Sequence, residues 1–342
     1  MMNIKGVEIP RVVYASGAYN FFGPGEGIGY GWWYDKYLKL FLPWLSSSEK
    51  AGWISKTTPF FQRDGNMKLD KNLQPIEKFP DCVKIYFWRG LALNSVGLSS
   101  PGAVPLFQMN EWHRRIRPFG LSHMSVLGTF EQRLAETNGY ACLLKKYLPD
   151  FLAPIWLEEN MSCPNTGHDV CSLSEERLAH LEIIRKEKLG IPVFAKLSPE
   201  DSVEEMVRIA RSGLCDGISL INTVKFGRLP EEIPWKKLFG TDDPDKSPLA
   251  KYGGGGLSGW ILGDLLCRRI AEFRKHEPDF PIMAGGGVNC HWNWFKTKKL
   301  IDRLVDKGRV NAIVIGTGKV MRPFYLRLTI WYAEKKLKEV GR

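Results

Sequence analysis

The sequence predicts an α/β protein folded as a (β/α)8 TIM barrel, with an aromatic-rich excursion near the N-terminus. From about residue 150 onward, short apolar runs alternate with longer amphipathic stretches, and each run ends in polar or glycine residues. This alternation is typical of a parallel sheet that is covered on both faces. The glycine-rich turns come late in the chain, whereas an open doubly wound sheet usually carries them after its first strand. The barrel is therefore favoured.

The second half of the chain contains five predicted strands, which are Pro154–Leu157, Pro192–Leu197, Gly217–Ile221, Phe280–Ala284 and Ala312–Ile315. Helical periodicity predicts helices over Ser174–Glu187 and Ser202–Ser212. In a barrel, the carboxyl ends of all strands converge on one rim. We therefore expect one functional rim that gathers Asn160, Lys196, Asn222, Gly285–Gly287 and Gly316–Thr317.

The first half is less regular. Its candidate strands are Val12–Ala15, Gly52–Lys56, Val83–Phe87 and Met124–Leu127. Residues 18–50 are interpreted as a long loop plus one helix, and the Trp residues that gather there are interpreted as packing residues rather than a base-stacking platform. No internal repeat or low-complexity linker divides the chain, so we expect residues 1–342 to form a single domain.

Composition narrows the class of protein. With 342 residues, 44% apolar content and 25% charged residues, the chain is typical of a globular protein. It has no run of about 18 uncharged apolar residues and no apolar signal core, so we expect a cytoplasmic protein that does not bind membranes. The net charge of +11 is scattered over solvated helix faces, which argues against a nucleic-acid partner. Seven cysteines without a CxxC pair argue against a disulfide framework or a metal site.

The segment from Leu157 to Gly167 places a thiol, Cys163, between two carboxamides, Asn160 and Asn165, directly after a predicted strand. A loop that follows a barrel strand is where catalytic groups usually lie. Carboxamides both donate and accept hydrogen bonds, which suits a planar heterocycle whose edge alternates C=O and N–H groups. Cys163 is therefore a candidate proton-transfer residue.

Two glycine turns, Gly285–Gly287 and Gly316–Gly318, follow successive predicted strands. Backbone N–H groups in such turns can approach a phosphate, and barrels commonly bind phosphate after their last two strands. The alternative is that these glycines only relieve tight turns. The chain has no GxxxxGK[ST] motif, so a nucleoside triphosphate is not the first ligand to consider.

Lys56 and Lys196 each stand at the end of a predicted strand. A buried lysine needs an anionic partner, so two on one rim beside a phosphate site favour an anionic redox ring such as reduced flavin. The alternative for either residue is an ordinary surface lysine. Four candidate carboxamides on separate rim loops favour a polar planar ligand, and these are Asn94, Asn160, Asn165 and Asn222, the last followed by Thr223.

Together these residues resemble the dihydroorotate dehydrogenase family, whose members are barrels that bind flavin mononucleotide (FMN). The motifs that carry the resemblance occur in order and are Lys56-Thr57, Asn94-Ser95-x-Gly97-Leu98, Asn160-Met161-Ser162-Cys163-Pro164-Asn165, Lys196-Leu197, Asn222-Thr223 and Gly255-Gly256-Leu257-Ser258-Gly259. The base is Cys in the soluble members and Ser in the membrane-associated members. Cys163 therefore resembles the soluble kind, which implies fumarate or another soluble electron acceptor, and we expect a homodimer.

The resemblance also implies residue roles. Cys163 would take a proton from C5 of dihydroorotate while hydride leaves C6 for flavin N5, and Lys56 would lie near both molecules. The implied substrate-binding residues are Lys56, Asn94, Val96, Gly97, Leu98, Asn160, Asn165, Asn222 and Thr223. The implied FMN-binding residues are Ala15, Ser16, Gly17, Lys56, Thr57, Asn160, Lys196, Ile221, Gly259, Gly286, Gly287, Gly316 and Thr317.

The sequence departs from the family pattern where Ser99-Ser100 replaces a Pro-Asn pair, in the loop 167–171, and in the Trp-rich segments 18–50 and 289–294. Two alternatives to dihydroorotate oxidation stay open at this level. One is an FMN-dependent reductase of a uracil-type ring, like dihydropyrimidine dehydrogenase or the tRNA dihydrouridine synthases. The other is a non-catalytic FMN-binding protein, which the pairing of Cys163 with Lys56 disfavours because a binding protein needs no base.

Overall fold

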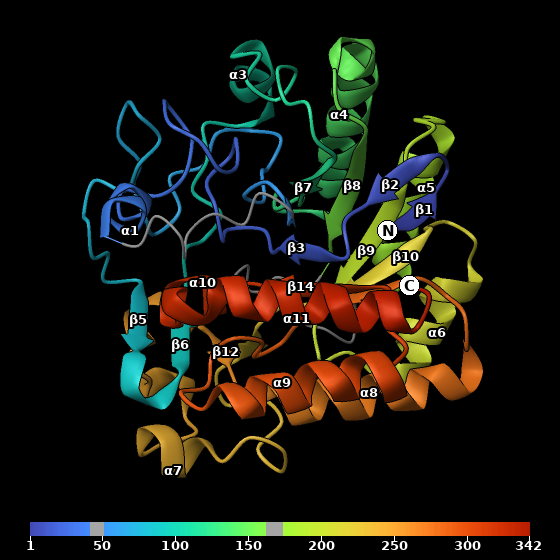
Figure 1. Cartoon of the computed structure of the whole chain (residues 1–342). Coiled ribbons are helices and arrows are strands. Elements are labelled where there is room, and N and C mark those ends of the chain that lie inside the picture. The colour runs from blue at the N-terminus through green and yellow to red at the C-terminus, as the bar shows by residue number, and fades with distance from the viewer. Residues whose placement is uncertain (42–50, 162–173) are drawn as a thin grey trace.

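The computed structural model describes residues 1–41, 51–161 and 174–342, and its centre is a barrel of eight parallel strands (Figure 1). These strands are β3 (Val12–Tyr14), β4 (Gly52–Trp53), β7 (Phe119–His123), β8 (Ile155–Asn160), β9 (Val193–Leu197), β10 (Gly217–Leu220), β13 (Ile282–Ala284) and β14 (Ala312–Ile315). Each strand lies beside its predecessor in the chain, and β14 pairs with β3. The circle is completed by Ser55 N, which donates to Gly120 O at 2.8 Å, and by Thr58 N, which donates to Ser122 O at 2.9 Å. The predicted (β/α)8 barrel is confirmed.

The interior of the barrel is apolar toward the amino ends of the strands and polar toward their carboxyl ends. The apolar part includes Ile54, Trp156, Phe194, Met283 and Val314. Two strand glycines make room for its large rings, because a Cβ at Gly120 would lie 2.5 Å from Trp156 Nε1 and one at Gly217 would lie 2.4 Å from the Phe194 ring. Side chains alternate along a strand, so the next inward positions are Ser122, Glu158, Lys196 and Ser219. This polar layer lies at the rim where barrels place their sites.

The outward faces of the strands pack against helices. The longer helices are α4 (Phe130–Tyr147), α5 (Ser174–Lys186), α6 (Val203–Arg211), α8 (Leu262–His276), α9 (Trp294–Asp302) and α11 (Leu326–Glu339). The shorter ones are α1 (Asp35–Phe41), α3 (Ala103–Gln108), α7 (Trp235–Phe239) and α10 (Gly318–Met321), with single 3-10 turns at Phe87–Arg89, Leu148–Asp150, Pro244–Lys246, Ala250–Tyr252 and Pro323–Tyr325 and a π-turn at Arg303–Lys307. Outward residues such as Leu157 and Leu197 join Leu144 of α4 and Leu181 of α5 in one apolar core.

A second, antiparallel sheet is built from chain that follows β4 and β10 (Figure 1). Its strands are β5 (Val83–Tyr86), β6 (Leu91–Asn94), β11 (Val224–Lys225) and β12 (Gly256–Gly259), in the spatial order β11-β12-β6-β5. Both insertions leave the barrel at carboxyl strand ends, so this sheet belongs to the rim side. A hairpin of β1 (Met2–Ile4) and β2 (Val7–Ile9) packs Met2, Val7 and Ile9 against the apolar barrel interior at the opposite end.

Of the less regular strand predictions, the structure confirms Val83–Phe87 over its first four residues and corrects Met124–Leu127. Val83–Tyr86 is a strand, but it belongs to the antiparallel sheet and not to the barrel. Met124–Leu127 is not a strand, because the barrel strand is the preceding segment Phe119–His123. The backbone N–H groups of Val126 and Leu127 donate instead to the Glu136 carboxylate, at 2.7 and 3.2 Å.

The other predicted elements agree with the structure. The predicted helices correspond to α5 and α6, and the Ser202 hydroxyl caps α6 by accepting from Glu205 N at 3.2 Å. Within residues 18–41 the excursion is a loop followed by α1, as predicted. The rest of that excursion, residues 42–50, lies outside the described residues.

Candidate functional site at the barrel rim

Five strand ends meet in one buried polar network. Lys196 of β9 places its Nζ 3.4 Å from Glu158 Oε1 of β8 and donates to Ser16 Oγ, which follows β3, at 2.5 Å. The same Glu158 oxygen accepts from Ser122 Oγ of β7 at 3.2 Å. Ser122 Oγ also lies 3.0 Å from Thr57 Oγ1, which follows β4. Predicted residues Ser16, Thr57 and Lys196 are thus brought together, and Glu158 joins them.

This network is buried, so its charged and polar groups must be stabilised by one another or by a ligand rather than by water. The exposed fractions of Lys196 and Glu158 are 5% and 0%, so the pair is removed from water. Glu158 Oε2 and Ser219 Oγ, also at an inward position, have no hydrogen-bond partner among the described residues. A buried polar atom without a partner costs about 1–3 kcal/mol. The layer therefore offers hydrogen-bonding capacity toward the barrel axis that a polar ligand would satisfy.

Lys56 is buried on the same rim, with an exposed fraction of 6%. Its ammonium donates to the carbonyl oxygen of Ser99 and lies 4.9 Å from the centroid of the Phe21 ring. The predicted loop Val96–Leu98 is therefore held beside Lys56 by the residue that follows it. Lys56 is one of the strand-end lysines that the sequence analysis selected, and it is not a surface residue.

The Ser99-Ser100 departure from the family pattern has a structural role. Ser99 Oγ accepts from Met67 N and donates to Val96 O, both at 3.2 Å. Ser100 exchanges backbone hydrogen bonds with Arg63, at 2.7 and 2.8 Å. Gly97 and Leu98 have φ angles of 69° and 60°, a left-handed turn that presents backbone groups. The loop thus keeps its shape without the Pro-Asn pair.

Two predicted carboxamides contact each other directly. Asn222 Nδ2 donates to Asn160 Oδ1 at 3.1 Å, and Asn222 Oδ1 accepts from the backbone N–H of Thr223 at 3.0 Å. Asn94 ends β6, where it is in register with Gly256 of the antiparallel sheet. The fourth predicted carboxamide, Asn165, and the predicted base, Cys163, lie outside the described residues.

The predicted glycine turns Gly285–Gly287 and Gly316–Gly318 follow β13 and β14, and the predicted residue Gly259 ends β12. A Cβ at Gly287 would lie 2.8 Å from Gly259 O, and one at Gly259 would lie 2.4 Å from Gly90 O, so both glycines permit close backbone approach. By contrast, Gly17 has no atom within 4 Å of such a Cβ, and at Gly316 the nearest atom is 3.5 Å away. The backbone at these two positions is open to a ligand. Thr317 Oγ1 lies 2.8 Å from Ser258 Oγ, which joins the last turn to β12.

The remaining predicted cofactor residues border these turns. Ala15 is buried and its N–H donates to Ile315 O of β14 at 3.0 Å. Ile221 is half-buried just after β10, and Gly286 leaves 3.4 Å between a Cβ and the nearest atom, on Leu266. The structure thus brings these predicted cofactor residues to the carboxyl ends of several barrel strands.

The sequence analysis missed Glu158, Ser122 and Ser219. A usable signal existed for Glu158, because it stands two residues before Asn160 in the same strand and must share its inward face. Ser122 and Ser219 had no comparable signal, since their importance depends on the strands that lie beside them.

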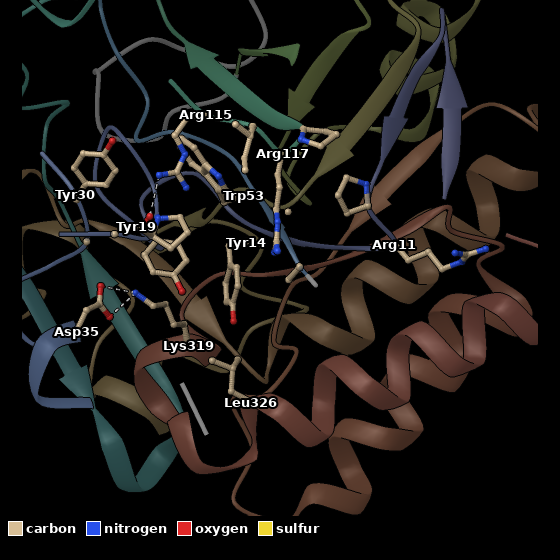
Figure 2. Close-up of a pocket in the computed structure, with 18 of the residues that line it drawn as sticks. Arg11, Tyr14, Tyr19, Tyr30, Asp35, Trp53, Arg115, Arg117, Lys319 and Leu326 are labelled. Carbon is tan, nitrogen blue, oxygen red and sulfur yellow. Dashed lines mark hydrogen bonds and ion pairs between the residues drawn. The ribbon is translucent and has the colours of Figure 1, made fainter. Parts of the chain in front are cut away.

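A separate cavity of about 1260 Å³ lies outside the barrel wall (Figure 2). Its lining includes the outward residues Tyr14 and Trp53, the cation Arg115, and Leu326 of α11. None of its described lining residues belongs to the predicted site. The cavity is therefore a different feature from the polar rim.

In the described ranges, no group of three His, Cys, Asp or Glu side chains is arranged to hold a metal ion. No helix there has the length and apolar character needed to cross a membrane.

Comparison with known proteins identifies the family. The family model of dihydroorotate dehydrogenase matches residues 74–293. The catalytic subunit of the NAD(+) enzyme dihydroorotate dehydrogenase B from Sulfolobus acidocaldarius is 31% identical over 233 residues, 67% of this chain and 65% of that relative. Dihydroorotate dehydrogenase A (fumarate) from Lactobacillus delbrueckii is 30% identical over 229 residues, 66% of each chain. The B-type catalytic subunit from Thermotoga petrophila is 28% identical over 84% of this chain and 87% of its own length.

The alignments with the Sulfolobus and Lactobacillus relatives thus cover just under two thirds of those proteins. The matched region nevertheless includes Asn94, Asn160, Lys196, Asn222 and Gly259 of the rim. The chain belongs to the dihydroorotate dehydrogenase family.

Proposed function

We propose that this chain is an FMN-dependent enzyme that oxidises dihydroorotate to orotate in de novo pyrimidine biosynthesis. The observation that carries the proposal is the buried rim, where Lys56, Lys196 and the Asn160–Asn222 pair converge with open glycine turns. Family membership supports the same activity.

The residues of the rim fit FMN. Lys196 supplies a buried cation beside unpartnered polar atoms, which suits the polar edge of an isoalloxazine ring. The open backbone at Gly17 and Gly316 suits a phosphate, since N–H groups there can be approached without a side chain intervening. When bound, FMN would supply the hydride acceptor that amino acids lack.

The chain's own residues would bind and orient the substrate. Asn94, Asn160, Asn165 and Asn222 with Thr223 would pair with the pyrimidine edge, and the backbone of Val96–Leu98 would donate to its carboxylate. Lys56 would place positive charge between flavin and substrate. Cys163 would accept the proton from C5, for which its thiol needs a lowered pKa or an arranged proton path.

The proposal includes a soluble electron acceptor such as fumarate, a homodimeric assembly and a cytoplasmic location. The relatives named for fumarate and those named for NAD(+) match with similar identity. Both acceptors therefore belong in the first assay of turnover.

The proposal is tested by purifying the protein and releasing its chromophore. We expect about one FMN per chain, and anaerobic addition of dihydroorotate should bleach the flavin absorbance, whereas dihydrouracil or NADH should bleach it far more slowly. A folded protein that does not bind FMN would contradict the proposal. Preferential reduction by dihydrouracil or NADH would favour the uracil-reductase alternative.

Substrate choice gives a second prediction. Orotate should perturb the flavin spectrum at lower concentration than uracil, because its carboxylate gains charged hydrogen bonds from Lys56 and the backbone N–H groups of residues 96–98. The expected difference in binding free energy is about 1.5–3 kcal/mol. Spectral titration of the FMN-loaded protein measures both constants, and equal affinities would show that the carboxylate site is absent.

A further inference from the structure

Lys319 is a buried cation outside the sequence-predicted site, two residues beyond Thr317 on α10. Its exposed fraction is 3%, and its Nζ lies 2.7 Å from Asp35 Oδ1 and donates to Asp35 Oδ2 at 2.8 Å (Figure 2). The ammonium also donates to Ala18 O at 2.9 Å and lies 3.6 Å from the centroid of the Tyr19 ring. All three donors thus have a partner in the N-terminal excursion.

Asp35 connects this cation to a second contact with the same loop. Its Oδ2 also accepts from the backbone N–H of Trp32 at 2.8 Å. The Trp32 indole Nε1 in turn donates to Gly17 O at 3.0 Å. Lys319, Asp35 and Trp32 therefore form one connected group, which we call the excursion clamp, and it holds two consecutive carbonyls, those of Gly17 and Ala18.

The segment held by the clamp is part of the rim. Ser16 Oγ accepts from Lys196, and the N–H of Ala15 donates to Ile315 O of β14. The backbone N–H of Lys319 donates to Gly316 O at 3.0 Å. Lys319 is therefore also attached to the last glycine turn through its backbone. The clamp thus joins the loop after β3 to the turn after β14, and both have open backbone facing the proposed ligand.

We infer that Lys319, Asp35 and Trp32 are positioning residues that hold Ser16–Ala18 and Gly316–Thr317 in the conformation that binds the cofactor. This inference rests on the proposed FMN function, and it assigns a role to the aromatic-rich excursion. Within residues 1–41, 51–161 and 174–342, the hydrogen bonds of the clamp side chains join it to Gly17 and Ala18 and to no proposed substrate-binding residue. Its effect should therefore fall on cofactor affinity, with the chemical step changed less.

Burial gives the clamp a pH dependence. Removal from water lowers the pKa of Lys319 to about 8, although Asp35 opposes this shift. Tyr19 and Tyr34 also face the ammonium with their rings, and burial raises the pKa of the Tyr34 hydroxyl well above its usual range. Loss of the proton above pH 8 would abolish the ion pair with Asp35 and loosen the Ala18 contact.

The test is FMN affinity, measured by quenching of flavin fluorescence on the cofactor-stripped protein. Lys319→Met should raise the FMN Kd by about 10- to 100-fold, the loss expected for charged hydrogen bonds. Lys319→Arg should restore most of the affinity and keep it above pH 8, where the wild-type Kd rises, because a guanidinium stays charged. Trp32→Phe, which removes the indole donor but keeps an aromatic ring and leaves the Lys319–Asp35 pair intact, should raise the Kd by a smaller factor.

Lys298→Met is a matched control, because Lys298 Nζ on α9 lies 3.1 Å from Asp302 Oδ2 and 4.9 Å from the Tyr332 ring centroid, a similar pairing with a carboxylate and a ring outside the predicted site. Its FMN Kd should equal that of the wild type. Without FMN, the backbone amides of residues 15–19 should exchange their hydrogens faster in Lys319→Met than in the wild type or in Lys298→Met. Unchanged exchange and Kd in Lys319→Met would overturn the inference alone, whereas a wild type that cannot bind FMN would overturn the proposed function.

Discussion

Cys163→Ala is expected to keep FMN and to lose most flavin reduction by dihydroorotate, since the proton at C5 then has no acceptor. Removal of a general base typically slows a reaction by about 10²- to 10⁴-fold. Anaerobic stopped-flow absorbance of the flavin, with dihydroorotate in excess, measures the reductive step without any electron acceptor. Because binding of orotate does not need the base, its Kd should change little.

Two variants make this result specific. Cys163→Ser should retain part of the rate, and more of it at high pH, because a hydroxyl gives up its proton less readily than a thiol. Cys142→Ala changes an exposed cysteine of α4 and should reduce at the wild-type rate. An Ala variant at position 163 that reduced as fast as the wild type would show that this thiol has no catalytic role.

Gly285→Ala is expected to be the most destabilising single methyl addition at the rim. A Cβ at this position would lie 1.7 Å from Val314 O and 2.5 Å from Val314 C, which are backbone atoms of the neighbouring barrel strand. The β13–β14 pairing would have to shift, so we expect a loss of at least about 3 kcal/mol in the free energy of unfolding. Urea unfolding of the cofactor-stripped protein measures this value.

Gly316→Ala is the matched comparison, because a Cβ there meets nothing closer than Ala15 Cβ at 3.5 Å. Its free energy of unfolding should change by less than about 1 kcal/mol. Its FMN affinity should nevertheless fall, since the added methyl covers backbone that the proposed phosphate site needs. Equal destabilisation of the two variants would contradict the packing argument, and unchanged FMN affinity in Gly316→Ala would contradict the placement of the phosphate.

Local patterns sufficed to predict the regular half of the barrel. Ala312–Ile315 is an uninterrupted apolar run and Val193–Leu197 is interrupted only by Lys196, as expected of strands buried on both faces, and α5 and α6 carry helical periodicity. Asn160 and Lys196 were found for the same reason, because a polar residue at or next to the end of an apolar run can be recognised from the sequence alone.

Local patterns failed where a strand is not apolar. The strand Phe119–His123 contains Gly120, Ser122 and His123, and only its neighbours explain them. Gly120 makes room for Trp156, while His123 Nδ1 lies 2.8 Å from Glu159 Oε2 on the next strand. Each partner lies about 36 residues along the chain from the residue that it contacts, so a local sequence pattern cannot predict these contacts.

By itself, the sequence determined the barrel class, the order of its later strands and the residue types at their carboxyl ends, because short-range side-chain alternation encodes burial. Only the tertiary structure decided that Glu158 and Lys196 share one buried layer, that Ser99 holds the loop over Lys56, and that Lys319 reaches Asp35. Each of those contacts joins residues that are far apart in the chain and whose burial depends on barrel closure. Closure removes them from water together, and that shared desolvation makes their pairing necessary.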